Sequence, residues 1–176
     1  PQEILRAERY VRPPADLEAI LLARRTDISF TMASPDRSWF MRAVSTPHGD
    51  IQLRGKEHVI LGGLQVDTKA NRSRAVTTSN QIGLVLVNPR TGATKTIETP
   101  KGATITAQTW SPSGTQIGYI ANFVDASHAF VADVASGKST QVSRTPLMPT
   151  MYTDLEFTAD GKNLIVVLLP EGRGTA

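Results

Sequence analysis

The stretch TWSPSGTQIGYI, from Thr109 to Ile120, places a Ser-Pro-Ser-Gly corner between two runs of apolar, aromatic and β-branched residues. Proline at the second position of a turn presets φ, serine side chains close the turn through hydrogen bonds, and glycine accepts a positive φ. Apolar runs on both sides of such a corner are typical of a β-hairpin. The stretch therefore predicts two antiparallel strands joined by a tight turn.

This hairpin pattern is repeated along the chain. FTMASPDRSWFMRAV, from Phe30, and YTDLEFTADGKNLIVVL, from Tyr152, lead through S-P-D-R and T-A-D-G corners into a second apolar run. Another hairpin pattern occurs twice, in GLVLVNPRTGATKTIE from Gly83 and in HAFVADVASGKSTQVS from His128. The repeating unit is about 45 residues long and contains four strands, which matches one blade of a β-propeller.

The sequence thus predicts an all-β fold, a partial β-propeller of about two and a half four-stranded blades, preceded by a short N-terminal helix. The predicted boundaries are an N-terminal extension and helix at 1–26, an incomplete propeller at 27–176, blade 1 at about 27–99 with an insertion at 46–80, blade 2 at about 103–143, and blade 3 from about 151. A closed propeller needs about four to eight blades. Because an open stack of blades exposes apolar faces, we expect this chain to be part of a larger propeller.

The helix is predicted in YVRPPADLEAILLARRTD, from Tyr10, where the two prolines suit a first helical turn. Leu17, Ile20 and Leu21 share one face, so we expect this helix to pack on a larger body. A helix lying on a membrane surface is disfavoured, because the basic residues gather at one end. NLIVVLLP, from Asn163, is much shorter than the roughly 18 apolar residues that span a bilayer, and it predicts a buried strand.

Composition excludes several classes of function. The chain contains no cysteine, which excludes disulfides, thiol catalysis and cysteine-ligated zinc. Its formal net charge of +3 comes from 19 basic and 16 acidic residues that are scattered along the sequence. A nucleic-acid-binding surface needs a longer basic stripe, so no nucleic-acid partner is expected.

The sequence assigns no catalytic, cofactor-binding or metal-binding residue, and predicts no cofactor. Nucleophile-elbow, zinc-protease, Walker, EF-hand and dinucleotide-binding motifs are absent. His48, His58 and His128 stand apart from one another and are interpreted as solvated or capping side chains. Gly62 and Gly63 predict a tight turn and not a phosphate cradle, because the strand-like LQVD follows them instead of a helix.

Aromatic residues occupy repeated positions next to the corners. Trp110 and Phe157 each come one residue before a corner, as a core residue between neighbouring blades would, although an aromatic ligand platform is the alternative. Trp39 and Phe40 are adjacent, so in a strand they point to opposite faces, and one of them is expected to pack inward.

Two segments carry a resemblance to a known family. PPADLEAILLARRTDISFTMASPDRSWFM, followed by LGGLQVDTKANRSR, resembles the N-terminal region of S9-family (prolyl oligopeptidase-like) serine peptidases, in particular the glutamyl endopeptidase-type branch. The matching elements are Pro13 and Pro14, Ser34 to Arg37, Leu61 to Asp67, and Asn71 to Arg74. TDLEFTADGKNLIVVLLPEGRG, from Thr153, is similar to the family as well. The chain departs from the family pattern at Ala33 and Gly62.

The resemblance implies a propeller that caps a C-terminal α/β-hydrolase domain and filters peptide substrates by access. The catalytic triad of the family lies in that hydrolase domain, so none of it is carried onto this chain. The expected partners are the remaining blades, the hydrolase domain and a peptide substrate, and the expected location is periplasmic or secreted. The chain alone is expected to be inactive, although its parent protein would hydrolyse peptide bonds.

Two other hypotheses remain open. One is an exported TolB-like propeller that acts as a binding or scaffold module without enzyme activity. The other is an intact small β-domain whose repeats are coincidental. The sequence that follows Ala176 in the gene would separate the peptidase from the scaffold.

Overall fold

Antiparallel β-sheets dominate the computed structural model, which describes residues 12–22, 31–49, 51–74, 77–150 and 154–172. The first four-stranded sheet has the order β1-β2-β6-β7 and comprises β1 (Thr31–Ala33), β2 (Phe40–Ser45), β6 (Gln81–Val87) and β7 (Thr94–Ile97). The second has the order β11-β10-β9-β8 and comprises β8 (Thr104–Trp110), β9 (Gln116–Asn122), β10 (Ser127–Asp133) and β11 (Ser139–Gln141). Each sheet is a simple antiparallel meander, as in one propeller blade.

The hairpin of β12 (Glu156–Phe157) and β13 (Leu164–Ile165) forms the first two strands of a third sheet of the same kind. The helix α2 (Ala15–Leu22) precedes all the strands. The prediction of an all-β, partial β-propeller with a short N-terminal helix is therefore confirmed. We refer to the first sheet as blade 1, the second as blade 2, and β12–β13 as the third hairpin.

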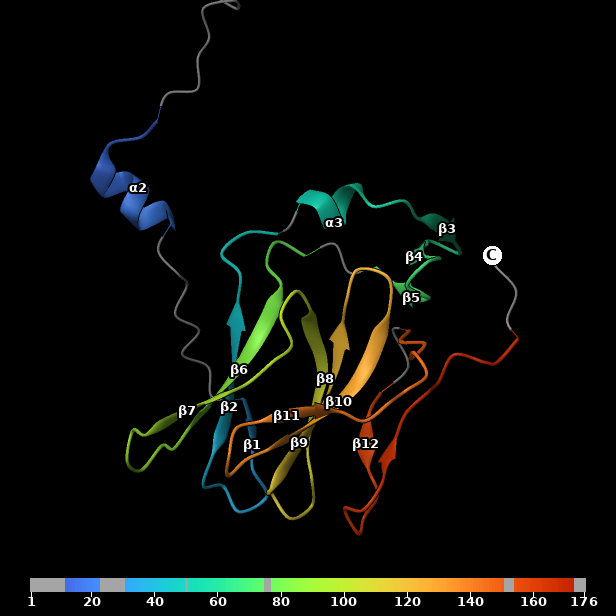
Figure 1. Cartoon of the computed structure of the whole chain (residues 1–176). Helices are drawn as coiled ribbons and strands as arrows, with labels where there is room; N and C mark the ends of the chain where they lie inside the picture. Colours follow the sequence, from blue (N-terminus) through green and yellow to red (C-terminus); the bar gives the residue numbers. More distant parts are fainter. Residues whose placement is uncertain (1–11, 23–30, 50, 75–76, 151–153, 173–176) are drawn as a thin grey trace, which may run out of the picture.

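The insertion in blade 1 forms a small unit of its own between β2 and β6. It comprises α3 (Ile51–Gly55), β3 (Val59–Leu61), β4 (Leu64–Asp67) and β5 (Arg72–Ser73), and its strands pair in the order β3-β4-β5. Gly62 and Gly63, with φ of 55° and 84°, form the predicted turn between β3 and β4. The Thr46 N–H donates to the Asn80 carbonyl at 2.8 Å, so the chain leaves and re-enters blade 1 at adjacent points. Figure 1 shows the insertion across one end of the two blades.

The three corners share one hydrogen-bonded geometry, which explains why they were recognisable in the sequence. The hydroxyl of the first corner residue accepts a hydrogen bond from the N–H five positions later: Ser34 from Trp39, Ser111 from Gln116, and Thr158 from Asn163. The fourth position has a positive φ in every corner: 57° at Arg37, 71° at Gly114 and 69° at Gly161. Hydrogen bonds from the Ser34 hydroxyl and from Ser38 lower the pKa of Asp36 to about 2.

The main hydrophobic core lies between blades 1 and 2. It contains twelve buried residues from both sheets: Met41, Leu84, Leu86, Ile97, Ala103, Ile105, Ile117, Tyr119, Ala121, Phe130, Ala132 and Val134. Trp39 and Trp110 pack against this cluster, and the Trp110 Nε1–H donates to the Met32 carbonyl of β1 at 2.8 Å. Trp110 therefore joins the two blades, as its position before the corner predicted, and Trp39 is the inward-packing member of its pair.

A smaller core lies on the other face of blade 2, where the third hairpin packs. Its buried members are Ile120, Ala129, Leu147 and Leu155. Gly118 is needed here, because a Cβ at this position would lie 2.8 Å from Leu155 Cδ2, 3.1 Å from Leu164 Cδ1 and 3.1 Å from Phe157 Cε2. Phe157 thus contacts blade 2 from the third hairpin, in agreement with a core role and not a ligand platform.

Two burial expectations are not met within the described residues. The helix α2 leaves Leu17, Ile20 and Leu21 exposed within the described residues, so its apolar face is not packed there. The basic end predicted for this helix, Arg24 and Arg25, lies outside the described residues. The segment from Asn163 was expected to be a buried strand, yet Ile165, Val167 and Leu168 are exposed.

The reason for the second error is physical: apolar residues of a blade are buried only where a neighbouring sheet covers them. Among the described helices, none is long and apolar enough to cross a membrane.

Candidate functional site

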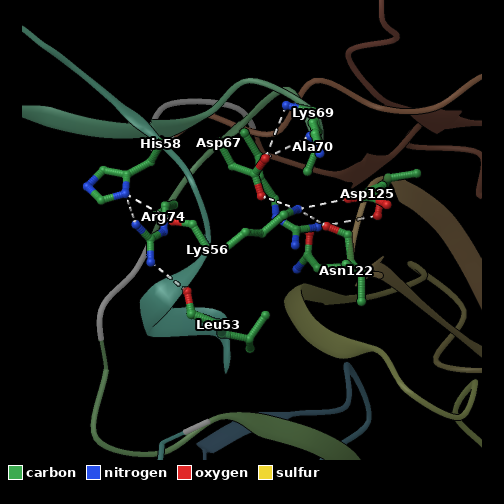
Figure 2. A network of polar contacts seen from close by, with 12 residues as sticks. Leu53, Lys56, His58, Asp67, Lys69, Ala70, Arg74, Asn122 and Asp125 are labelled. Atoms are coloured by element: carbon green, nitrogen blue, oxygen red, sulfur yellow. Dashed lines mark hydrogen bonds and ion pairs between the residues drawn. The ribbon is translucent and has the colours of Figure 1, made fainter. Parts of the chain in front are cut away.

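The insertion is held against blade 2 by a network of charged side chains, shown in Figure 2. Lys56 follows α3, and its Nζ lies 2.6 Å from Asp67 Oδ2 in β4 and 3.0 Å from Asp125 Oδ1 in the β9–β10 turn. The same ammonium group donates to the Val124 carbonyl. The ammonium group therefore has two hydrogen-bond acceptors and a second carboxylate as an ion-pair partner, and two of these three groups belong to blade 2.

Asp67 is the central acceptor of this network and is only 2% exposed. Its Oδ1 accepts hydrogen bonds from the N–H groups of Lys69, at 3.1 Å, and Ala70, at 3.0 Å. Burial alone would raise the pKa of Asp67, but the hydrogen bond from Lys56 and those from the backbone outweigh it, so the pKa is lowered. The carboxylate is thus held in its ionised form, which suits a structural anchor better than a proton donor.

Arg72 in β5 provides a second connection to the β9–β10 turn. Its Nη1 donates to the Ala126 carbonyl at 3.3 Å and to the Ser127 hydroxyl at 3.1 Å. Burial of the guanidinium lowers its pKa, and the charges of Asp67 and Asp125 oppose that shift. Ser127 also donates to Asn122 at 2.8 Å, so the hydrogen bonds continue into β9.

Arg74 fixes the insertion internally. Its Nη2 donates to the carbonyls of Leu53, at 2.5 Å, and Arg54, at 2.8 Å, near the C-terminal end of α3. Its Nη1 contacts His58 Nδ1. His58 Nδ1 also lies 3.1 Å from the Lys56 carbonyl oxygen. His58 is therefore part of a hydrogen-bonded network and not a solvated side chain.

A cleft of about 540 Å³ lies beside this network. Its walls come from the insertion, from residues 77–81, from the start of β8 and the end of β9, and from Pro149 and Thr150. The charged residues that line it are Arg54, Lys56, Asp67, Arg72 and Arg74. Four cations thus face one carboxylate, and that carboxylate is already paired with Lys56. The cleft is the best candidate for a functional site in the described part of the chain.

The structure does not bring the three histidines together with a nucleophile and an acid. His48 lies in the turn after β2, where its carbonyl accepts a hydrogen bond from Thr46, and His128 Nδ1 lies 3.3 Å from the Ser143 hydroxyl. Among the described residues, no group of three or more histidine, cysteine, aspartate or glutamate side chains could hold a metal ion.

The charged network was missed by sequence reasoning. The available signal was VDTKANRSR, where one acidic and three basic residues surround a short turn between strands. Their partners at 124–127 lie in another blade, and no local pattern connects the two segments.

No family model matches the chain, and no curated protein matches it in sequence. Among solved structures, the chain is similar to TolB from Acinetobacter baumannii, with a TM-score of 0.44 and 17% sequence identity over 82% of this chain. The chain spans 27% of the length of that protein. The fold assignment rests on the two four-stranded sheets and their repeated corners.

Proposed function

We propose that this chain is the non-catalytic, N-terminal portion of the propeller of an S9-type serine peptidase. In this role it would shape the entrance to the active site and help to dock an α/β-hydrolase domain. The hydrolase domain would cleave peptide bonds through an acyl-enzyme, with a serine activated by histidine and an oxyanion hole.

One observation carries this proposal: two of the segments behind the family resemblance build the anchored insertion. Leu61 to Asp67 forms the end of β3, the diglycine turn and β4, and Asn71 to Arg74 contains β5. Three charged residues in these segments, Asp67, Arg72 and Arg74, hold the insertion together and attach it to blade 2. A motif that performs a specific structural task is harder to meet by chance than the same letters in a solvated loop.

The open flank of the blades supports the same proposal. Ile165 in β13 exposes its apolar side chain, as do Val167 and Leu168 after the third hairpin and Val142 after β11. In a propeller such surfaces are covered by the next blade. The proposal therefore includes further blades as partners of this chain.

A binding or scaffold propeller without an enzyme is the second candidate, favoured by the basic cleft. The coding sequence downstream of Ala176 distinguishes the two. A peptidase requires further blades and then a G-x-S-x-G elbow followed by aspartate and histidine. A scaffold requires blades that close the ring and no such elbow.

Peptide hydrolysis assays test whether the catalytic activity resides in the downstream domains and not in this chain. The protein with its downstream domains should cleave fluorogenic peptides and lose that activity when the elbow serine is changed to alanine. The 176-residue chain should be inactive under the same conditions. Turnover by the 176-residue chain, or the absence of an elbow from the downstream sequence, would refute the proposal.

A further inference from the structure

Arg72 has more hydrogen-bond donors than the protein fills. A guanidinium carries five N–H groups in a planar fork. Within the described residues, only Nη1 of Arg72 has acceptors, the Ala126 carbonyl and the Ser127 hydroxyl. The two carboxylates near it, Asp67 and Asp125, are both ion-paired with Lys56 instead. The other N–H groups of Arg72 are not among the buried, unpartnered polar atoms of the described residues, and Arg72 lines the cleft, so these donors are accessible to an acceptor that enters it.

Arg72 faces the same cleft as a second arginine with open donors. Arg54, from the end of α3, lines the cleft and donates from Nη2 to the Thr77 carbonyl at 3.0 Å. Arg54 is exposed, and its Nε and Nη1 donate to no acceptor among the described residues. Ser73 and Thr104 line the cleft as well. By contrast, Lys56 and Arg74 use their donors to hold the insertion, so they contribute mainly positive charge.

We propose that this cleft binds a small oxyanion, a carboxylate or phosphate group, through the guanidinium groups of Arg72 and Arg54. An arginine fork matches the geometry of such groups with paired hydrogen bonds. The volume of about 540 Å³ accommodates the anionic group together with a small organic body. The bound anion would complete the hydrogen bonding of Arg72 and connect the insertion to blade 2 more firmly. This inference does not depend on the proposed peptidase role, because it concerns only contacts within the described residues.

Titration of the 176-residue chain tests the site. Inorganic phosphate and citrate serve as the two probes, at constant ionic strength in chloride, with binding followed by calorimetry and by amide chemical shifts. We expect saturable binding, with shifts confined to residues around the cleft. A preference for phosphate or for citrate identifies which oxyanion the cleft accepts. Raising the chloride concentration should weaken the binding of either probe.

Three variants sharpen this test. Arg72→Lys keeps the charge but loses the fork, and it should weaken binding about tenfold. Arg54→Gln removes an exposed cation and should weaken binding about fivefold. Arg90→Gln, in the exposed turn after β6, should bind like the parent chain. Spectra of the free variants establish that each is folded, and Arg54→Gln decides the outcome if Arg72→Lys disturbs the insertion.

Two results would overturn the inference. One is the absence of saturable binding of both probes to the parent chain up to tens of millimolar. The other is an affinity that Arg54→Gln leaves equal to that of Arg90→Gln, because the anion then binds elsewhere on the basic surface.

Discussion

Blade 2 has two faces, and they are packed very differently. The face toward blade 1 shares a cluster of twelve buried residues with that blade, including Leu86 and Tyr119, both fully excluded from solvent. The face toward the third hairpin has four buried residues, and beyond them Ile165 remains 60% exposed. Both faces belong to the same strands of blade 2, so the difference in burial comes from the elements that cover each face.

The comparison shows how stability is distributed in an unfinished stack of blades. Four strands cover one face of blade 2, whereas two short strands cover part of the other. Since each blade is stabilised mainly by its immediate neighbours, the first interface should hold most of the free energy of unfolding. The third hairpin should open at a lower free energy than the rest.

The largest effect is expected at the first interface. Leu86→Ala removes a fully buried side chain from the cluster between the blades, and it should lower the free energy of unfolding by about 3 kcal/mol. Leu168→Ala is the matched control, because this leucine is exposed, and it should cost less than about 0.5 kcal/mol. Chemical denaturation measures both. If the two substitutions lower the free energy of unfolding equally, the two faces of blade 2 do not differ in packing as described.

The next largest effect is expected at the network of charged side chains between the insertion and blade 2. Asp67→Asn removes the partner of Lys56 and should destabilise the insertion by about 2 kcal/mol, since the buried ammonium loses its nearest counter-charge. Asp125→Asn is the control, because Asp125 is 67% exposed and its ion pair should contribute little. Hydrogen exchange in β4 and β5 measures the loss. Unchanged protection in Asp67→Asn would mean that the network does not hold the insertion.

The same carboxylate predicts a pH dependence. The pKa of Asp67 is lowered in the folded protein, so its contribution is fully present above its unfolded pKa of about 4. That contribution is lost as the pH falls below 4 through the folded pKa, because the protonated acid no longer pairs with Lys56. In Asp67→Asn, the protection of β4 and β5 should therefore fall less steeply in this acid range. A parallel fall in both proteins would contradict the assignment.

At the second interface, Gly118→Ala should cost about 1–2 kcal/mol, because the added Cβ would lie 2.8 Å from Leu155 Cδ2. The effect should be local, with lower hydrogen-exchange protection in β12 and β13 and little change between blades 1 and 2. Gly83→Ala is a matched control in β6, where the nearest atom to the added Cβ lies at an ordinary 3.4 Å. A uniform loss of protection in both interfaces would show that the two faces of blade 2 unfold as one unit.

The smallest effect is expected at a corner, and it has the opposite sign. Arg37 adopts φ of 57° at the position where Gly114 and Gly161 occupy the other two corners. Arg37→Gly should raise the melting temperature slightly, by the equivalent of about 0.5 kcal/mol, because glycine relieves the left-handed strain but loses more entropy on folding. Gly114→Ala should lower the melting temperature, because the new Cβ would lie 3.3 Å from Pro35 Cδ and φ at this position is 71°. Destabilisation by Arg37→Gly would show that the arginine side chain contributes more than the strain costs.

Much of the fold could be predicted because the decisive chemistry is local. The corners around Ser34, Ser111 and Thr158 use side chains within five residues of one another, so their turn signals are visible in the sequence. The position of Trp110 repeats with the corner, and this regularity predicted its place between the blades. Burial was harder to predict: Ile20 of α2 and Ile165 of β13 have apolar patterns typical of core residues, yet no sheet or helix of the described chain covers them.

The candidate site could not be predicted, because its contacts join distant segments. Lys56 forms an ion pair with Asp125, and Arg72 donates a hydrogen bond to Ser127. Both contacts join the insertion of blade 1 to blade 2. Taken alone, these residues have the character of ordinary solvated charges. Only the register that places the β9–β10 turn beside the insertion makes them a network.

The Thr46–Asn80 hydrogen bond at the base of the insertion has a consequence for how such proteins can diversify. The chain departs from one strand of blade 1 and returns to the next at neighbouring positions, so everything between these two points could be lengthened, shortened or exchanged without shifting the pairing of β2 with β6. Evolution or a protein engineer could therefore graft a new loop onto this end of the blade and leave the scaffold beneath it intact.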